Sequence, residues 1–171
     1  MGFTKHGVAA LTLRMEQPTK GTGEILAVFV PGKLRNPMNG THGHWSKHAR
    51  WAKTWRERTC WAVFESAYRG AGVVGVNMGR MLLALEMQPD RPKVVTFHAI
   101  VPSKFDDDNL PPCCKPIRDA LKDMGVINDD RTSAGHTFVY EQEAKRARVI
   151  HGVFVRVKFA ELVPAGEERR C

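Results

Sequence analysis

Runs of apolar residues bounded by proline and glycine predict a series of β-strands. The clearest is the run Glu24–Val30, which has the character of a buried strand and is ended by Pro31 and Gly32. Four further strands are predicted, the first two joined as a hairpin and the last two forming a second pair: Arg80–Met87, Val94–Pro102, Thr137–Glu143 and Arg148–Phe159.

Two segments show the 3.6-residue period of amphipathic helices. The first begins at Ser46, which can act as an N-cap, and runs to about Tyr68. Its apolar stripe comprises Trp51, Trp55, Thr59, Ala62 and Val63, widened by Phe64 and Ala67. Tryptophans among basic residues can also stack on unpaired bases, but amphipathicity alone explains this stripe, so we interpret it as core.

The second helix is predicted after residue 115. Pro116 suits a first helical position, where its missing N–H costs little, and Gly125 suits a C-terminal stop. The apolar positions between them follow an i, i+3, i+4, i+7 spacing: Ile117, Ala120, Leu121 and Met124. Strands around two main helices predict an α+β fold with a mixed sheet. We expect an N-terminal extension (1–23), a single domain (24–160) and a polar tail (161–171).

The charge of the chain nominates a polyanion as partner. The 171 residues carry a net charge of +8, with a pI near 9.6. Such a surface attracts phosphate backbones, although a merely soluble basic domain explains the charge equally well. The candidate DNA contacts lie in the loop after the first strand and on the first helix: Lys33, Arg35, Lys47, Arg50 and Lys53.

The cysteines and the hydropathy pattern favour a cytoplasmic protein. Four cysteines form no CxxC pair and no regular framework, which fits a reducing compartment. The longest apolar runs are too short to cross a bilayer, and the N-terminus shows no secretory signal pattern. We therefore expect no membrane association.

An acidic stretch interrupts this basic chain. Residues 104–130 hold seven of its eighteen carboxylates. If Phe105–Asn109 is extended, Asp106 and Asp108 project to one side, with Cα atoms roughly 6.5 Å apart. Asp130, which follows the helix, can return to the same site, with Asp129 beside it. Oxygen ligands of this kind suit Mg²⁺, with Mn²⁺ as an alternative.

Other interpretations of these residues exist. A calcium loop counted from Asp106 fails, because its twelfth residue is Ile117 rather than a carboxylate. A solvated acidic loop beside a helix N-terminus would need no metal. Elsewhere in the chain, His42, His44 and His48 could form a zinc site, although no cysteine or carboxylate cluster lies near them in sequence.

The order of residues in the acidic stretch resembles the RusA-type Holliday-junction resolvases. The matching positions span about 25 residues: Asp106, Asp108, Asn109, Lys115, Asp119-Ala-Leu121, Gly125 and Asp129-Asp130. The resemblance implies that Asp106, Asp108 and Asp130 bind a divalent metal and that Lys115 assists at the phosphate. It gives supporting roles to Asn109, Asp119 and Asp129. Lys115 follows Asp108 by seven residues, against four in the family, which indicates an insertion within Leu110–Cys114.

The resemblance also implies an activity. A RusA-like enzyme is a Mg²⁺-dependent endodeoxyribonuclease that resolves four-way junctions by paired symmetric cuts leaving 5′-phosphates, in DNA recombination and repair. It would work as a homodimer, because a four-way junction offers two equivalent strands. It would be found in a bacterial or phage-infected cell. Two alternatives stay open: a related nuclease acting on other branched or flap DNA, and a DNA-binding module without catalysis.

Overall fold

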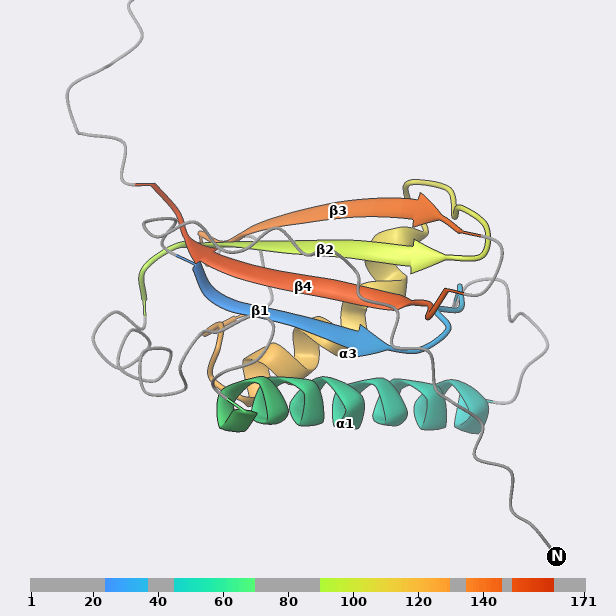
Figure 1. Cartoon of the computed structure of the whole chain (residues 1–171), viewed down its shortest axis with the longest axis horizontal. Helices are drawn as coiled ribbons and strands as arrows, with labels where there is room; N and C mark the ends of the chain where they lie inside the picture. Colours follow the sequence, from blue (N-terminus) through green and yellow to red (C-terminus); the bar gives the residue numbers. More distant parts are fainter. Residues whose placement is uncertain (1–23, 37–44, 70–89, 130–134, 146–148, 162–171) are drawn as a thin grey trace, which may run out of the picture.

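A computed structural model describes residues 24–36, 45–69, 90–129, 135–145 and 149–161 of the chain. They form an α+β domain in which two helices pack on one four-stranded mixed sheet (Figure 1). This confirms the predicted fold class. The predicted extension (1–23), the predicted strand Arg80–Met87 and nearly all of the predicted tail lie outside the described residues.

The sheet has the order β1-β4-β2-β3. Its strands are β1 (Glu24–Pro31), β2 (Lys93–Val101), β3 (Thr137–Ala144) and β4 (Gly152–Phe159). Strand β4 pairs antiparallel with both β1 and β2, whereas β3 runs parallel to β2. The predicted pairing of the last two strands is wrong, because β2 lies between them. The chain passes from β2 to β3 through a helix, and such a crossover produces a parallel pair.

The first helix, α1 (Trp45–Arg69), lies along the β1 side of the sheet and packs on both β1 and the second helix (Figure 1). Trp55, Thr59 and Val63 are buried, as the periodicity predicts. Phe64 is 47% exposed, so its expected place in the buried stripe is wrong. It lies nine residues after Trp55, which at 3.6 residues per turn is the opposite side of the helix.

The second helix, α3 (Leu110–Asp123), begins earlier than its periodicity predicts. Pro111 and Pro112 occupy its first turn, where the missing N–H groups have no intrahelical acceptor to lose. Pro116 is therefore inside the helix rather than at its start, and Lys115 lies in the second turn. The residues assigned to an insertion before the helix are the first turn of the helix itself.

The C-terminus of α3 is fixed by Gly125, as expected. This glycine has φ of +70°, and its N–H donates to the carbonyl of Lys122 (2.9 Å). The N–H of Val126 donates to the carbonyl of Leu121 (2.9 Å), which completes a Schellman motif in which both apolar side chains are buried. The helix therefore ends at a defined point, and the chain turns toward β3.

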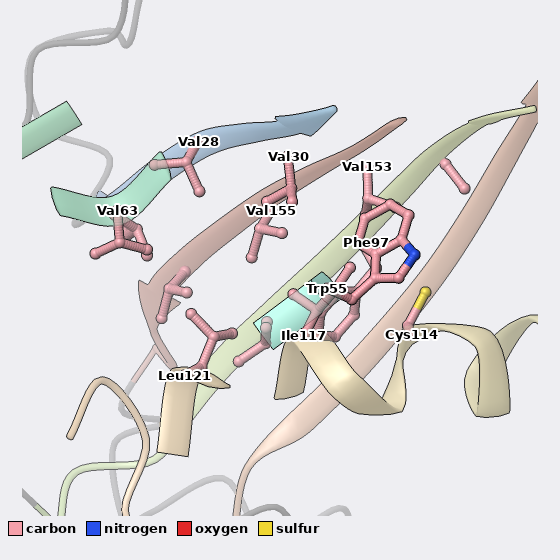
Figure 2. Close-up of a cluster of buried hydrophobic side chains, with 14 of the residues drawn as sticks. Val28, Val30, Trp55, Val63, Phe97, Cys114, Ile117, Leu121, Val153 and Val155 are labelled. Atoms are coloured by element: carbon pink, nitrogen blue, oxygen red, sulfur yellow. The ribbon is translucent and has the colours of Figure 1, made fainter. Parts of the chain in front are cut away.

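The core lies between the sheet and the two helices (Figure 2). Alternate residues of β1, β2 and β4 point at the helices, and Trp55, Ile117 and Leu121 fill the space from the other side. Arg118 fastens α3 to β3, since its Nη1 donates to the Tyr140 hydroxyl (3.0 Å) and its guanidinium lies 5.2 Å from the Phe138 ring centroid. The middle of α3 is thus held against β3.

Candidate functional site

Asp106 and Asp108 lie in the short connection from β2 to α3. The N–H of Asn109 donates to the carbonyl of Asp106 (2.9 Å), which closes a turn over residues 106–109. The segment is therefore not extended, and the projection of Asp106 and Asp108 to one side of a strand does not apply. Both carboxylates are exposed on this turn, immediately before α3.

The acidic turn is clamped to the sheet by Gln142 of β3. Its side-chain amide accepts a hydrogen bond from the Phe105 N–H (2.8 Å) and donates one to the Phe105 carbonyl (2.7 Å). Asn109 adds a contact from its Nδ2 to Asp106 Oδ2 (3.3 Å) rather than capping α3 with its side chain. A rigid strand thus holds the backbone next to Asp106, which is the support a ligand-binding carboxylate needs.

Lys115 points along α3 toward Asp119. Its Nζ lies 3.1 Å from Asp119 Oδ1, while Lys115 itself remains largely exposed. Three residues more than the family spacing add about 4.5 Å of helix between the acidic turn and this lysine. Because the ammonium is on a flexible stem and exposed, it can change its direction without disturbing the core.

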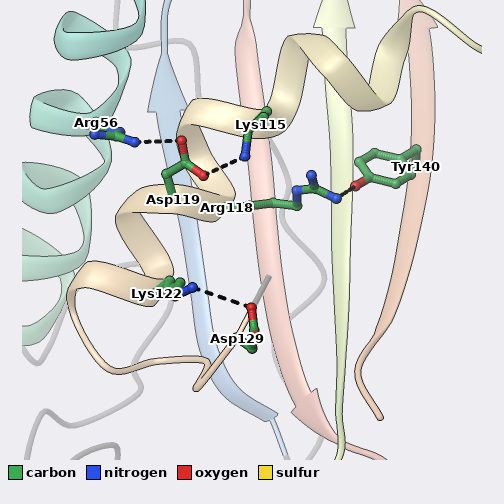
Figure 3. A network of polar contacts seen from close by, with 7 residues as sticks. All are labelled: Arg56, Lys115, Arg118, Asp119, Lys122, Asp129 and Tyr140. Atoms are coloured by element: carbon green, nitrogen blue, oxygen red, sulfur yellow. Dashed lines mark hydrogen bonds and ion pairs between the residues drawn. The ribbon is translucent and has the colours of Figure 1, made fainter. Parts of the chain in front are cut away.

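Asp119 joins the two helices, as Figure 3 shows. Its Oδ2 lies 2.6 Å from Nη2 of Arg56 on α1. Partial burial by itself raises the pKa of Asp119, but the hydrogen bonds and charges of Arg56 and Lys115 outweigh it and hold that pKa below its usual range. The same hydrogen bond raises the pKa of Arg56. Asp119 is therefore ionised and holds both cations at neutral pH.

The second acidic group follows α3. Lys122 Nζ lies 3.3 Å from Asp129 Oδ1 (Figure 3), and Asp130 lies outside the described residues. The segment before Asp129 is anchored by a buried histidine. The backbone N–H of Lys93 donates to His136 Nδ1 (3.1 Å), so Nε2 carries the proton and donates to Asn128 Oδ1.

This anchor extends to the beginning of β2. Asn128 Nδ2 donates to Asp90 Oδ1 (3.3 Å), and His136 is 3% exposed. Burial lowers the pKa of His136, the charge of Lys93 lowers it further, and Asp129 opposes both. The neutral imidazole therefore ties the loop after α3 to the first residues of β2.

The two acidic groups thus lie at opposite ends of α3. Asp106 precedes the helix and Asp129 follows it, and a helix of 14 residues is about 21 Å long. Strand register agrees, since β3 begins opposite Val94 at the start of β2, while the acidic turn follows the end of β2 (Figure 1). Within the described parts of the chain, no group of three His, Cys, Asp or Glu side chains could hold a metal ion. The exposed carboxylates of Asp106 and Asp108 are oxygen donors that suit Mg²⁺.

The predicted DNA contacts are all on the surface. Lys33 and Arg35 follow β1, and Lys47, Arg50 and Lys53 lie in the N-terminal half of α1; each is exposed. Lys53 has a weak contact with Glu57 (3.9 Å). Of the histidines considered for zinc, only His48 is among the described residues, and its ring neighbours that of Trp51 (5.4 Å between centroids).

The adjacent cysteines have a structural role. Cys113 and Cys114 are both fully buried, and burial raises the pKa of both thiols, that of Cys113 to about 11. Neither is a nucleophile at neutral pH, because the thiol rather than the thiolate predominates. Cys113 Sγ donates to the Arg35 carbonyl (3.2 Å), which ties the loop after β1 to α3.

Three residues of the site are not indicated by the sequence: Arg56, Gln142 and His136. Each acts on a segment at least eight residues away, and Gln142 and Arg56 act over 37 and 63 residues. No local spacing connects such positions, so only the tertiary fold reveals them.

A separate finding concerns the membrane: among the described residues, no helix has the length and apolar character needed to cross one.

No protein-family model matches the chain, and no curated protein does so either.

Proposed function

We propose that this protein is a Mg²⁺-dependent endodeoxyribonuclease that cuts branched DNA, with the four-way junction as its substrate. The observation that carries the proposal is the turn of Asp106 and Asp108, where two exposed carboxylates follow a backbone segment that Gln142 holds to the sheet, in a chain of net charge +8. A bound divalent cation would offset the mutual repulsion of clustered carboxylates. The basic surface around them suits a polyanion as the second ligand.

Each residue has a definite role in this proposal. Asp106 and Asp108 would hold the metal, which when bound activates water and polarises the scissile phosphate. Lys115, one and a half turns into α3, would contact the phosphoryl oxygens as negative charge develops on them. Asp119 and Arg56 hold the resting position of Lys115, and the basic residues of α1 and of the loop after β1 bind the phosphate backbone.

A second copy of the chain would complete the site. One chain keeps Asp106 and Asp129 about a helix length apart, too far for both groups to bind one ion directly. A twofold axis near the middle of α3 and β3 would place the acidic turn of one copy near Asp129 of its partner. Strand β3 ends the described sheet, so it is available at that axis.

The first experiment compares cutting of a synthetic four-way junction, a flap and a plain duplex, with and without Mg²⁺. We expect paired nicks with 5′-phosphate ends on the junction, and Asp108→Asn should abolish cutting while junction binding persists. Junction binding without cutting by the wild-type protein would instead identify a DNA-binding module. That outcome has a structural basis, since Lys115 is displaced along α3 and paired with Asp119.

The second experiment tests whether the site is shared between two copies. Asp108→Asn and Asp130→Asn proteins, each inactive, are mixed and allowed to exchange subunits. In a shared arrangement a mixed dimer has one wild-type site, so nicking should return at roughly a quarter of the wild-type number of sites. If all ligands come from one chain, no mixed dimer has an intact site and nicking stays absent.

A further inference from the structure

The aromatic side chains of α1 differ widely in exposure. Trp55 is 1% exposed, whereas Trp61 is 70% exposed and Phe64 47%. The exposed rings pack edge to face, with centroids 6.2 Å apart and planes at 86°. A tryptophan ring offers more apolar area than almost any other side chain, so two adjoining exposed rings form an apolar surface on which a ligand can pack.

Positive charge lies on the same side of the helix. Arg50 precedes Trp61 by eleven residues, close to three full turns, so both side chains leave the helix in nearly the same direction. Their separation along the axis is about 16 Å, which spans several nucleotides of a strand. Apart from Arg56, the charged residues on the exposed surface of the helix are four basic ones and two acidic ones: Lys47, Arg50, Lys53, Arg58, Glu57 and Glu65. Glu57 contacts Lys53 at 3.9 Å and offsets part of its charge.

We propose that the outward face of α1, formed by Arg50, Lys53, Trp61 and Phe64, binds a single-stranded segment of DNA, with unpaired bases stacked on the aromatic pair. This proposal rests on the proposed function and extends it, because it adds base stacking on Trp61 and Phe64 to the backbone contacts of the α1 cations. The charge decides between the candidate occupants. A second copy of this face would bring like charges together, whereas a phosphate backbone is attracted to them.

Aromatic rings recognise unpaired bases in particular. Every base has a π-face that can stack on tryptophan or phenylalanine, but in a duplex those faces are already stacked on neighbouring base pairs. Branched DNA can expose unpaired bases where its arms meet. The face therefore favours strands that are open at a branch over continuous duplex, while its cations bind either form.

The experiment measures binding in EDTA, so that no cutting occurs. Fluorescence anisotropy gives dissociation constants for a mixed-sequence single strand, its duplex and a four-way junction. We expect Trp61→Ala to weaken single-strand binding about tenfold and duplex binding less than twofold. Trp61→Phe should restore most of the affinity, because it keeps a stacking ring. The matched control is Ile150→Ala, which removes a side chain that is 62% exposed and lies outside α1.

Distinct results contradict the inference and the proposed function. If the wild-type protein binds all three DNAs and Trp61→Ala binds the single strand equally well, the inference fails while the proposed function stands. An equal loss on single strand and duplex also overturns it. So does a Trp61→Ala effect confined to self-association in sedimentation, or to vesicles of anionic phospholipid. If the wild-type protein binds no DNA, both proposals fail.

Discussion

Arg56 Nη2 and Asp119 Oδ2, 2.6 Å apart, join the two helices across the surface of the domain. The side chain of Asp119 is only 18% exposed, and Lys115 contacts its other oxygen. One carboxylate therefore stabilises the packing of α1 on α3 and also holds the lysine that we place at the phosphate. If the proposed function is correct, stability and activity are coupled through this residue.

The Asp119 interactions predict a pH-dependent contribution to stability. Replacing Asp119 with Asn should lower the free energy of unfolding by about 1 kcal/mol at pH 7, because two charged hydrogen bonds weaken. The folded pKa of Asp119 lies below its ordinary value of 3.8, so the stabilisation is fully present above that value and is lost as pH falls through the folded pKa. Urea unfolding of both proteins at pH 7 and pH 3 measures the difference.

The matched control is Glu57→Gln, which removes an exposed carboxylate contacting Lys53 at 3.9 Å. It should change stability by no more than a few tenths of a kcal/mol. An Asp119→Asn effect that stayed constant at acid pH would show that lost packing, rather than lost charge, causes it.

His136 predicts a second pH effect. Its pKa is lowered from 6.5 in the folded protein, chiefly by burial. Between that lowered value and 6.5 the unfolded chain binds a proton that the folded chain does not, so stability falls as pH falls through this window. His136→Gln should be less stable at pH 7.5 and should lack this part of the acid sensitivity. Denaturant midpoints at pH 7.5 and 5.5 provide the measurement, and parallel losses in both proteins would contradict the assignment.

Gln142 predicts an effect on metal affinity, given the proposed function. Gln142→Ala removes both hydrogen bonds to Phe105 and frees the turn that carries Asp106. The Mg²⁺ concentration for half-maximal cutting should rise about tenfold, as for other residues that orient metal ligands. Glu141→Gln is the control, since its side chain contacts His98 instead. An unchanged Mg²⁺ dependence in Gln142→Ala would contradict a role of Gln142 in positioning the metal ligands.

The buried Trp55 and the exposed Trp61 should contribute very differently to stability. Trp55→Ala should reduce the free energy of unfolding by about 3–5 kcal/mol, because it leaves a large cavity between α1 and the sheet. Trp61→Ala should change it by less than about 0.5 kcal/mol. Thermal unfolding followed by circular dichroism compares them. A large loss in Trp61→Ala would mean that this ring is part of the core.

The sequence predicts the elements of the fold better than their arrangement. Apolar runs and 3.6-residue periods locate β1, β2, α1 and the buried face of α3, because each pattern reports which side of its own element is covered. The partner of β3 is not predictable in this way. An alternating strand such as Thr137–Ala144 fits a neighbour on either side, and only the α3 crossover makes it parallel to β2.

The candidate site shows the same division. The order of acidic and basic residues nominates Asp106, Asp108 and Lys115, but the turn at Asp106 and the early start of α3 come from local chemistry that helical periodicity does not reveal. Pro111 and Pro112 look like helix breakers, yet they fit the first turn. The clamp by Gln142 depends on β3 lying next to β2, so no sequence-local rule anticipates it.

The fixed ends of α3 have a consequence for how this segment tolerates change in length. Gly125 sets where the helix stops, and the acidic turn sets where it starts. Adding one helical turn would separate the two carboxylate groups by about a further 5.4 Å while leaving each of them chemically intact. Insertions and deletions within α3 should therefore reduce the proposed activity far more than those in the surface loops. This should hold even at positions whose side chains take no part in binding or catalysis.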